Sequence, residues 1–270
     1  MEDALMEDAL MQAAAATHPT ADAGTPVLEL AGIGKRFGAI EALGAVDLAL
    51  RHGEVLGLMG DNGAGKSTLV KIIAGNFAPS SGTIRMEGRE VRFADPSDAR
   101  AEGIEVVYQD LALCDNLSAA LNIHLGREIT WGLGPFRFLD RRRMVARATE
   151  IFTELKTNTE PRDLVASMSG GQRQAVAIAR TRLSDPKIVL MDEPTAAISV
   201  RQVAEVLELI RTLRRTGHAV VLISHRMQDV FGVCDRVAVL RRGEKVADKP
   251  IADTTPEEVT GLITGAIERA

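Results

Sequence analysis

The sequence predicts an α/β protein with a largely parallel sheet, and three observations lead to that prediction. Short runs of apolar and β-branched residues alternate with segments of helical periodicity along most of the chain. The apolar runs are continuous rather than alternating, as in strands that are covered on both faces. A glycine-rich loop joins one of these runs to a helical segment, which is the strand–loop–helix order found in such sheets.

The chain begins with a segment that we expect to be a disordered tail, residues 1–26. It opens with Met-Glu-Asp-Ala-Leu twice and continues with an alanine run and a loose Thr/Pro/Gly stretch. Its acidic residues, unaccompanied by Lys or Arg, account for the formal net charge of −5 and leave the remainder close to neutral. That balance gives no electrostatic reason to expect nucleic acid or an anionic membrane surface as the main partner. No apolar run approaches the roughly 20 residues of a membrane-spanning helix, and no secretion signal is recognisable.

The main domain is expected at residues 27–250, followed by a helical extension at 251–270 whose one helix is 256–267. The stretch from about 111 to 183 is mainly helical in pattern, so it should form a helical lobe inserted between halves of the sheet. Within it, residues 126–139 hold three glycines, Pro135 and the only Trp, and we expect an irregular surface connection. The periodicity predicts strands at 55–59, 104–108, 188–191, 220–223 and 237–240, and helices at 67–74, 141–156, 172–183, 200–215 and 228–233.

The glycine-rich loop lies between the first of these strands and the first of these helices, and it fits the pattern G-x-x-x-x-G-K-[ST]. Its glycines allow backbone N–H groups to close around phosphate oxygens, and the helix N-terminus adds its positive dipole end. Lys66 can then reach the β and γ phosphates of a nucleotide, while the Ser67 hydroxyl can bind Mg²⁺. The loop consists of Gly60, Asp61, Asn62, Gly63, Ala64, Gly65, Lys66, Ser67 and Thr68.

A second element must distinguish among kinases, GTPases, motors and transport ATPases, all of which use such a loop. Residues 188–191 are four apolar residues that run directly into Asp192 and Glu193. A buried strand that ends in a carboxylate would place Asp192 at the carboxyl edge of the sheet, beside the loop and Mg²⁺. Glu193 could polarise the attacking water as a general base. The alternative is a core strand followed by a solvated acidic turn.

The third element stands at the start of the helix at 172–183. It reads Met168, Ser169, Gly170, Gly171 and Gln172. Here the sequence resembles the ATP-binding-cassette (ABC) ATPases, whose signature is Leu-Ser-Gly-Gly-Gln just ahead of the acidic strand. The resemblance covers residues 27–243. It implies an ABC-type P-loop core with an inserted helical subdomain and an antiparallel β portion near the N-terminus. It also implies ATP and Mg²⁺ as ligands.

Three further residues match this family by type and order, and their roles come from the resemblance. Gln109 matches the glutamine that senses Mg²⁺, which it would hold with Ser67 and Asp192, and it leads into the segment touching the membrane subunit. His225 matches the switch histidine at the γ-phosphate, which makes Lys66, Glu193 and His225 the catalytic residues. Phe37 matches the aromatic residue that stacks on adenine. The remaining histidines are expected to be ordinary surface or loop residues: His18, His52, His124 and His218.

Two departures from the family pattern affect what can be expected. Met168 replaces the signature leucine, a volume-conserving change that should be mild. After Pro194 most families place Ser-Ala-Leu-Asp, whose acid helps couple the two ATP sites. Here residues 196–199 read Ala-Ala-Ile-Ser, with no carboxylate. This puts the coupling between sites in doubt, though not ATP binding.

The segments 107–118, 194–197 and 224–227 resemble the ATPases of monosaccharide importers of the ribose, fructose and xylose kind. This implies an ATP-hydrolysing subunit, peripheral at the cytoplasmic face of the inner membrane. Its partners would be separate membrane permease subunits and, indirectly, an extracytoplasmic sugar-binding protein. One P-loop and one signature per chain imply an ATP-dependent head-to-tail homodimer. The two cysteines, Cys114 and Cys234, fit reduced thiols of a cytosolic protein.

Three other readings stay open on the residues. An importer ATPase for another solute, such as an amino acid, would share every catalytic residue. A cassette protein acting on ribosomes or DNA would usually show two fused cassettes, a basic surface or a long coiled-coil insertion. A P-loop kinase would leave the signature and His225 unexplained. The sequence leaves open which sugar is carried, and import rather than export rests on the resemblance alone.

Overall fold

The computed structural model describes residues 24–133, 136–196 and 198–268. The expected disordered tail, residues 1–26, therefore falls almost wholly outside the described residues. Within them, no helix combines the length and the apolar character needed to cross a bilayer.

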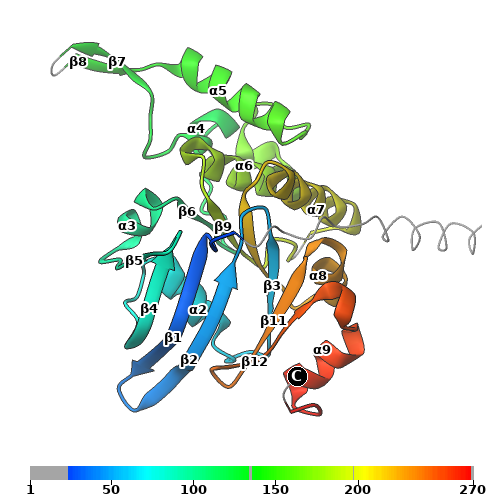
Figure 1. Cartoon of the computed structure of the whole chain (residues 1–270). Helices are drawn as coiled ribbons and strands as arrows, with labels where there is room; N and C mark the ends of the chain where they lie inside the picture. Colours follow the sequence, from blue (N-terminus) through cyan, green and yellow to red (C-terminus); the bar gives the residue numbers. More distant parts are fainter. Residues whose placement is uncertain (1–23, 134–135, 197, 269–270) are drawn as a thin grey trace, which may run out of the picture.

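The centre of the molecule is a six-stranded sheet in the order β12-β11-β3-β10-β9-β6 (Figure 1). Five of these strands run parallel, and β12 pairs antiparallel with β11 at one edge. All residues of β3 and β10 are buried, as the continuous apolar runs require. The strands are β3 (Val55–Met59), β6 (Ile104–Val107), β9 (Ile188–Asp192), β10 (Ala219–Ile223), β11 (Arg236–Arg241) and β12 (Glu244–Pro250).

Two hydrophobic layers cover the two faces of this sheet. Along β3, Val55 and Met59 belong to one layer while Leu56 and Leu58 belong to the other, because side chains alternate along a strand. The first layer is shared with the helical lobe and with α7 (Val200–Arg215) and α8 (Met227–Val233). The second is shared with the helix that follows the glycine-rich loop, α2 (Lys66–Ile73), and with an antiparallel sheet.

The antiparallel sheet has the order β2-β1-β4-β5 and lies against the side of the molecule that holds α2 (Figure 1). It confirms the β portion expected near the N-terminus, so the α/β fold class is confirmed in both parts. The short helix α3 (Pro96–Ala101) leads from this sheet back into β6. The strands are β1 (Leu28–Phe37), β2 (Ile40–Leu50), β4 (Ser81–Met86) and β5 (Arg89–Val91).

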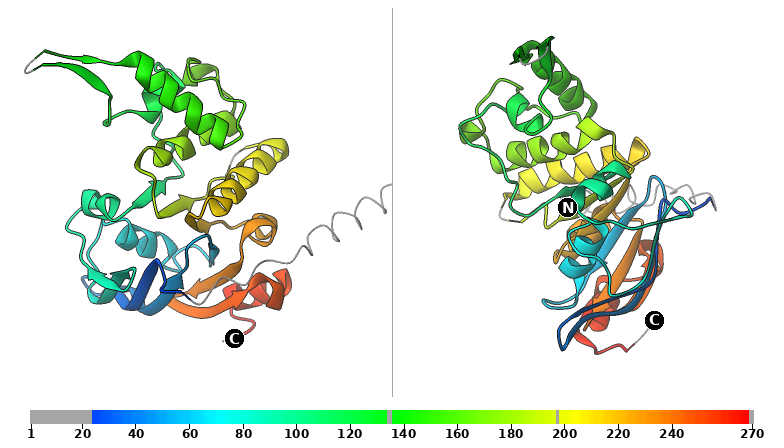
Figure 2. Two further views of the ribbon diagram at one scale, coloured as in Figure 1. Left: turned by 45° about the horizontal axis from the view of Figure 1, so that its top comes forward. Right: turned by 90° about the vertical axis from the view of Figure 1, so that its left-hand side faces the viewer.

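The helical lobe follows β6 and lies at the opposite end of the molecule from the C-terminus (Figures 1 and 2). Its longest helix, α5, buries Met144, Ala148, Ile151 and Phe152 at helical spacing. The lobe comprises α4 (Ala119–Ile123), α5 (Arg141–Glu154), the turn η1 (Val165–Ser167), α6 (Gly170–Thr181) and the turn η2 (Arg182–Ser184).

The structure corrects the prediction for residues 126–139. Instead of an irregular connection, they contain a β-hairpin of β7 (Thr130–Leu133) and β8 (Phe136–Leu139). Its strands are short, but Trp131 pairs across them with Phe138, and such aromatic cross-strand pairs stabilise hairpins. Pro135 lies outside the described residues.

Two smaller predictions are also corrected. Helix α9 (Pro256–Thr264) ends three residues earlier than expected, because Gly265 adopts a left-handed conformation at its C-terminus. His124 and His218 lie in connections between elements, as expected, but they are buried rather than at the surface. In His218, Nδ1 donates to Pro186 O at 2.6 Å and Nε2 contacts the Arg182 guanidinium.

Candidate nucleotide site

The glycine-rich loop folds as a compact cradle between β3 and α2. Gly60, Gly63 and Gly65 all have positive φ angles, of 151°, 77° and 103°. At Gly60 an added Cβ would lie 2.3 Å from the carbonyl oxygen of Leu240, so a side chain there is excluded on steric grounds as well. A cavity of 160 Å³ opens over the loop and is lined by Ala42 and residues 62–68. Ala42 is a lining residue that the sequence pattern did not reveal.

Lys66 lies at the base of this cradle. Its Nζ donates to the carbonyl oxygens of Gly60 and Asp61, at 2.7 and 2.9 Å, so the lysine closes the loop onto itself. Burial lowers the pKa of Lys66, and the nearby carboxylates of Glu193, Asp61 and Asp192 act in the opposite direction. The lysine and the acidic strand end therefore share one electrostatic site.

Asp192 ends β9 and is half-buried. Burial raises the pKa of Asp192, and the neighbouring Glu193 carboxylate raises it further, while Lys66 and Lys71 lower it. Within the described part of the chain, no cluster of three His, Cys, Asp or Glu side chains could hold a metal by itself. A carboxylate and a hydroxyl, such as those of Asp192 and Ser67, are instead the kind of oxygen donors that suit Mg²⁺ when phosphate oxygens complete the shell.

Glu193 stands immediately after β9 with φ of 51°, and its N–H donates to the Ile223 carbonyl oxygen at 2.9 Å. This contact fixes the residue against the end of β10. The carboxylate then accepts a hydrogen bond from Nδ1 of His225 at 2.8 Å. His225 is exposed, while the Glu193 side chain is mostly buried.

A buried contact holds the loops that carry these two residues. Thr195, two residues after Glu193, donates from its hydroxyl to the Asp229 carboxylate, which is buried in α8. Arg226 lies 3.4 Å from the same carboxylate. No sequence pattern predicts this link, because it joins positions 34 residues apart that no local pattern relates.

The sequence-predicted residues are thus brought to one edge of the sheet. The strands β3, β10, β9 and β6 are consecutive neighbours, and at their carboxyl ends stand the glycine-rich loop, His225, Asp192 with Glu193, and Gln109. Gln109 lies exposed, two residues past β6. Carboxyl ends of parallel strands are where α/β proteins bind ligands.

The signature residues lie in a different place. Ser169 caps α6, accepting from the Gln172 N–H at 3.3 Å, while the Gln172 side chain accepts from the Ser169 N–H at 3.0 Å. They line a separate cavity of 480 Å³ together with Lys156, Ser199 and Gln202. No residue of this cavity lines the cradle around Lys66.

The signature packs directly on the start of α7, and its two glycines allow this. A Cβ on Gly170 would lie 2.8 Å from Ile198 Cγ2, and one on Gly171 would lie 3.1 Å from the Gln202 Cγ. Gln202 in turn forms a second capping box with Ser199. In the Ala-Ala-Ile-Ser segment at 196–199, residue 197 lies outside the described residues. Ser199 serves as the N-cap of α7.

Phe37 ends β1 and is 43% exposed. Its ring meets that of Phe77 edge-on with centroids 5.5 Å apart, and Lys35 Nζ lies 5.2 Å from its centroid. Phe77 and Lys35 are neighbours that the sequence pattern did not reveal. The exposed part of the Phe37 ring could accept a flat base, as the resemblance implies.

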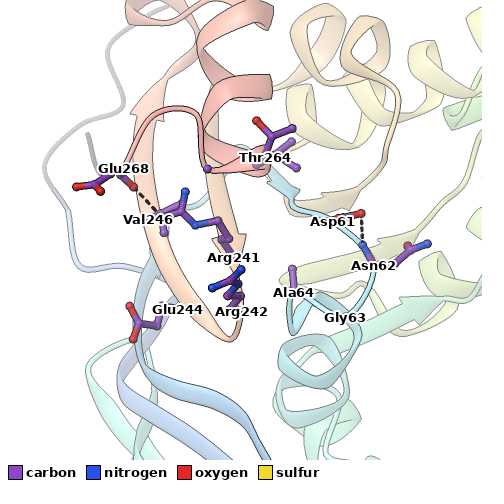
Figure 3. Close-up of a pocket in the computed structure, with 12 residues that line it drawn as sticks. Asp61, Asn62, Gly63, Ala64, Arg241, Arg242, Glu244, Val246, Thr264 and Glu268 are labelled. Carbon is purple, nitrogen blue, oxygen red and sulfur yellow. Dashed lines mark hydrogen bonds between the residues drawn. The ribbon is translucent and has the colours of Figure 1, made fainter.

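A larger pocket of 610 Å³ adjoins the loop on its other side (Figure 3). It lies between Asp61 and Asn62 on one wall and Arg241, Arg242 and Glu268 on the other (Figure 3). Gly243, at the turn between β11 and β12, donates to the Ala64 carbonyl oxygen at 3.0 Å. Through this hydrogen bond the turn between β11 and β12 holds the phosphate loop in place.

Comparison with known proteins gives consistent results. Residues 43–196 match the ABC transporter family. The fructose import ATP-binding protein FrcA of Rhizobium meliloti is 44% identical over 90% of this chain and 95% of its own length. The xylose/arabinose import ATP-binding protein XylG of Sulfolobus acidocaldarius is 43% identical over 88% of this chain and 94% of its own. Other relatives are longer: the chain spans only 48% of the ribose import ATP-binding protein RbsA of Geobacillus kaustophilus, at 39% identity.

Solved structures show the same architecture. A nucleotide-free ATP-binding cassette from an ABC transporter superposes with a TM-score of 0.75 at 26% identity, covering 88% of this chain and 95% of that one. A dimeric cassette in a post-hydrolysis state with ADP and Pi gives a TM-score of 0.68 at 26% identity, covering 83% and 98%.

Proposed function

The chain belongs to the ABC transporter family, and from that premise we propose that it binds and hydrolyses ATP to drive uptake of a monosaccharide through a separate permease. The observation that carries the ATPase part is the convergence of four strand ends. The phosphate loop, His225, Asp192 with Glu193, and Gln109 line one edge of the sheet in consecutive strands. Phosphoryl transfer to water needs a loop that binds the phosphates, a carboxylate that holds the metal cation and a carboxylate that accepts a proton from the attacking water.

The residues divide this work among them. Backbone N–H groups of residues 62–68 and the α2 N-terminus bind the phosphates, and Lys66 turns from its loop carbonyls to the β and γ oxygens. Ser67, Asp192 and Gln109 would hold Mg²⁺, which would neutralise charge on the transferred phosphoryl group. Glu193 accepts the proton of the attacking water.

His225 orients Glu193 in this proposal. Its Nδ1 bond to the carboxylate leaves Nε2 free to face the γ-phosphate. Phe37 stacks on the adenine. Together these residues place nucleotide and water on the same edge of the sheet, which is the positioning that this chemistry depends on.

A second copy of the chain completes the site. Ser169, Gly171 and Gln172 line a cavity separate from their own cradle, although the α6 N-terminus presents an anion-binding end. In a head-to-tail pair, the signature of each copy meets the γ-phosphate held by the other. The dimeric cassette among the similar structures supports this arrangement.

The transported solute is proposed from the relatives. Two that match this chain along nearly their whole length are import ATP-binding proteins for fructose and for xylose/arabinose. The partners would be integral permease subunits, with the chain bound at the cytoplasmic face of the membrane. A sugar-binding protein outside the membrane would deliver the solute.

Two measurements test this function. Free phosphate released from ATP by the wild-type chain, and lost in Lys66→Ala, supports hydrolysis; a phosphorylated small-molecule acceptor instead would indicate a kinase. A tagged chain taken from gently solubilised membranes should carry a polytopic permease and a monosaccharide-binding protein. Recovery of an amino-acid permease would change the proposed solute from a monosaccharide to an amino acid. Recovery of ribosomes would overturn the transport role.

A further inference from the structure

The β7–β8 hairpin carries an exposed aromatic face that nothing in the ATPase uses. Three of the nine aromatic residues of the chain lie in it, Trp131, Phe136 and Phe138. They are 60%, 71% and 55% exposed. Large exposed apolar groups that cluster in this way mark interaction surfaces.

All three rings lie on the same face of the hairpin. Phe136 and Phe138 are two residues apart on one strand, and Trp131 is the cross-strand partner of Phe138. Trp131 and Phe138 also touch, with ring centroids 5.4 Å apart. Arg137 lies on the opposite face, where its guanidinium donates to the Thr130 hydroxyl.

The base of the hairpin is fixed to the lobe. The Asp140 N–H donates to the Ile129 carbonyl oxygen at 2.7 Å, and the Asp140 side chain caps α5. Helix α5 is anchored by its buried face, whereas the hairpin projects from the lobe, away from the sheet (Figures 1 and 2). The lobe therefore presents the aromatic face at a defined position, clear of the nucleotide site.

Exposed cations follow this hairpin in the chain. Arg141 and Arg142 begin α5 directly after the hairpin, and within the described residues neither makes an ion pair or a side-chain hydrogen bond. Arg143 is exposed too, and its side chain forms an ion pair with the Asp140 cap. The whole-chain charge balance hides this local cluster, because the compensating acidic residues lie elsewhere.

We propose that this hairpin docks on an anionic phospholipid surface, and we call Trp131, Phe136, Phe138, Arg141 and Arg142 the membrane foot. A lipid surface accounts for both halves of the pattern. Aromatic rings partition into the zone between headgroups and acyl chains, and arginines bind the phosphates above it. The inference rests on the proposed function only in placing the chain at a membrane.

The chain offers its own probe for a test, because Trp131 is its only tryptophan. The full chain is mixed with vesicles of phosphatidylcholine alone or of phosphatidylcholine with phosphatidylglycerol. Tryptophan emission and co-sedimentation are measured without nucleotide. We expect a blue shift and sedimentation with the anionic vesicles, weakened at high salt because charge contacts are screened.

Variants distinguish vesicle binding by the membrane foot from non-specific binding by other exposed apolar groups. Phe136→Ser with Phe138→Ser should weaken vesicle binding on the order of tenfold or more, and Arg141→Glu with Arg142→Glu should abolish the preference for anionic lipid. Val200→Ser, which removes an exposed apolar side chain on α7, should bind as the wild type does. Phosphate release should be unchanged in the foot variants, so loss of ATPase and loss of docking can be told apart.

Equal sedimentation with and without vesicles would overturn the proposal. So would unchanged binding by the double serine variant. A Trp131 blue shift that requires purified permease in detergent, and that vesicles alone never produce, would assign the face to a protein partner and reject the lipid docking.

Discussion

Glu193 combines an unusual backbone with a specific side-chain contact. Its φ of 51° is rare for a residue other than glycine, asparagine or aspartate, and its N–H bond to Ile223 fixes it there. The chain direction that results brings the carboxylate to Nδ1 of His225. Strained positions of this kind concentrate at functional sites.

The first prediction concerns this carboxylate. In Glu193→Gln, phosphate release should fall by at least about 100-fold, because the amide cannot accept the proton of the water. Nucleotide affinity should change little, since Lys66 and the loop are untouched. Phosphate release and equilibrium binding of a fluorescent ATP analogue measure the two quantities. Hydrolysis near the wild-type rate would assign the base to another residue.

A second prediction at this scale concerns His218, whose buried ring is satisfied in the neutral form. Burial lowers the pKa of His218, partly offset by its bond to Pro186 O. Arg182 lowers that pKa further, while Asp185 and Glu154 raise it. Because the folded-state pKa lies below the unfolded value of about 6.5, the unfolded state binds more protons as the pH falls. The free energy of unfolding should therefore decrease below about pH 6.5.

Urea unfolding between pH 7.5 and 5 tests this effect by comparing the wild type with two histidine variants. His218→Gln, which can keep a donor near Pro186, should show a smaller loss of stability on the acid side than the wild type. His52→Gln alters an exposed histidine and serves as the control. Parallel pH curves for the wild type and His218→Gln would exclude His218 as the source.

At the scale of elements, strands and helices with a clear periodicity could be predicted from the sequence. Elements that depend on pairing with another strand could not. Helix α7 has the predicted bounds because it has an apolar stripe and a serine cap. The hairpin β7–β8 has strands too short for a periodicity signal, and its cross-strand pairing, which includes Trp131 with Phe138, defines it. The long strands β1 and β2 were expected from the family resemblance rather than from their own pattern.

The glycine loop yields a third prediction, with a matched control inside the loop. Gly60 and Gly63 both have positive φ, but only at Gly60 would a Cβ strike backbone, at Leu240 O. Gly60→Ala should lower the free energy of unfolding by about 3 kcal/mol and abolish ATP binding. Gly63→Ala should cost only about 1 kcal/mol, from its φ alone. Denaturant unfolding and ATP binding measure both, and equal effects at the two positions would contradict the steric argument.

The contact between signature and α7 gives a fourth prediction. Gly171→Ala would press on Gln202 at 3.1 Å and should disturb the α6 N-terminus without touching the cradle. ATP binding to the single chain should persist, whereas phosphate release should fall about tenfold or more because the signature no longer meets the partner's nucleotide. A loss of ATP binding instead would place the signature in the chain's own site.

For the whole molecule, the residue types of the candidate site and the place of Asp192 beside the loop could be predicted, but the proximity of His225 to Glu193 could not. The order of loop, acidic strand and signature is readable in the sequence, and so are Lys66, Asp192 and Glu193. That β10 lies between β3 and β9, and so brings His225 beside Glu193, depends on strand order that one sequence does not encode locally. The support from Gly243 and the link from Thr195 to Asp229 were missed for the same reason.

The central claim is that two copies of the chain share each ATP between the phosphate loop of one and the signature of the other. Mixing two inactive variants tests it most directly. Lys66→Ala removes the loop lysine, and Ser169→Arg blocks the signature, so each variant alone should hydrolyse no ATP. In a mixed dimer, the intact loop of one chain faces the intact signature of the other, so an equal mixture should recover roughly a quarter of wild-type phosphate release. No recovery on mixing, or wild-type activity in Ser169→Arg alone, would contradict the shared site.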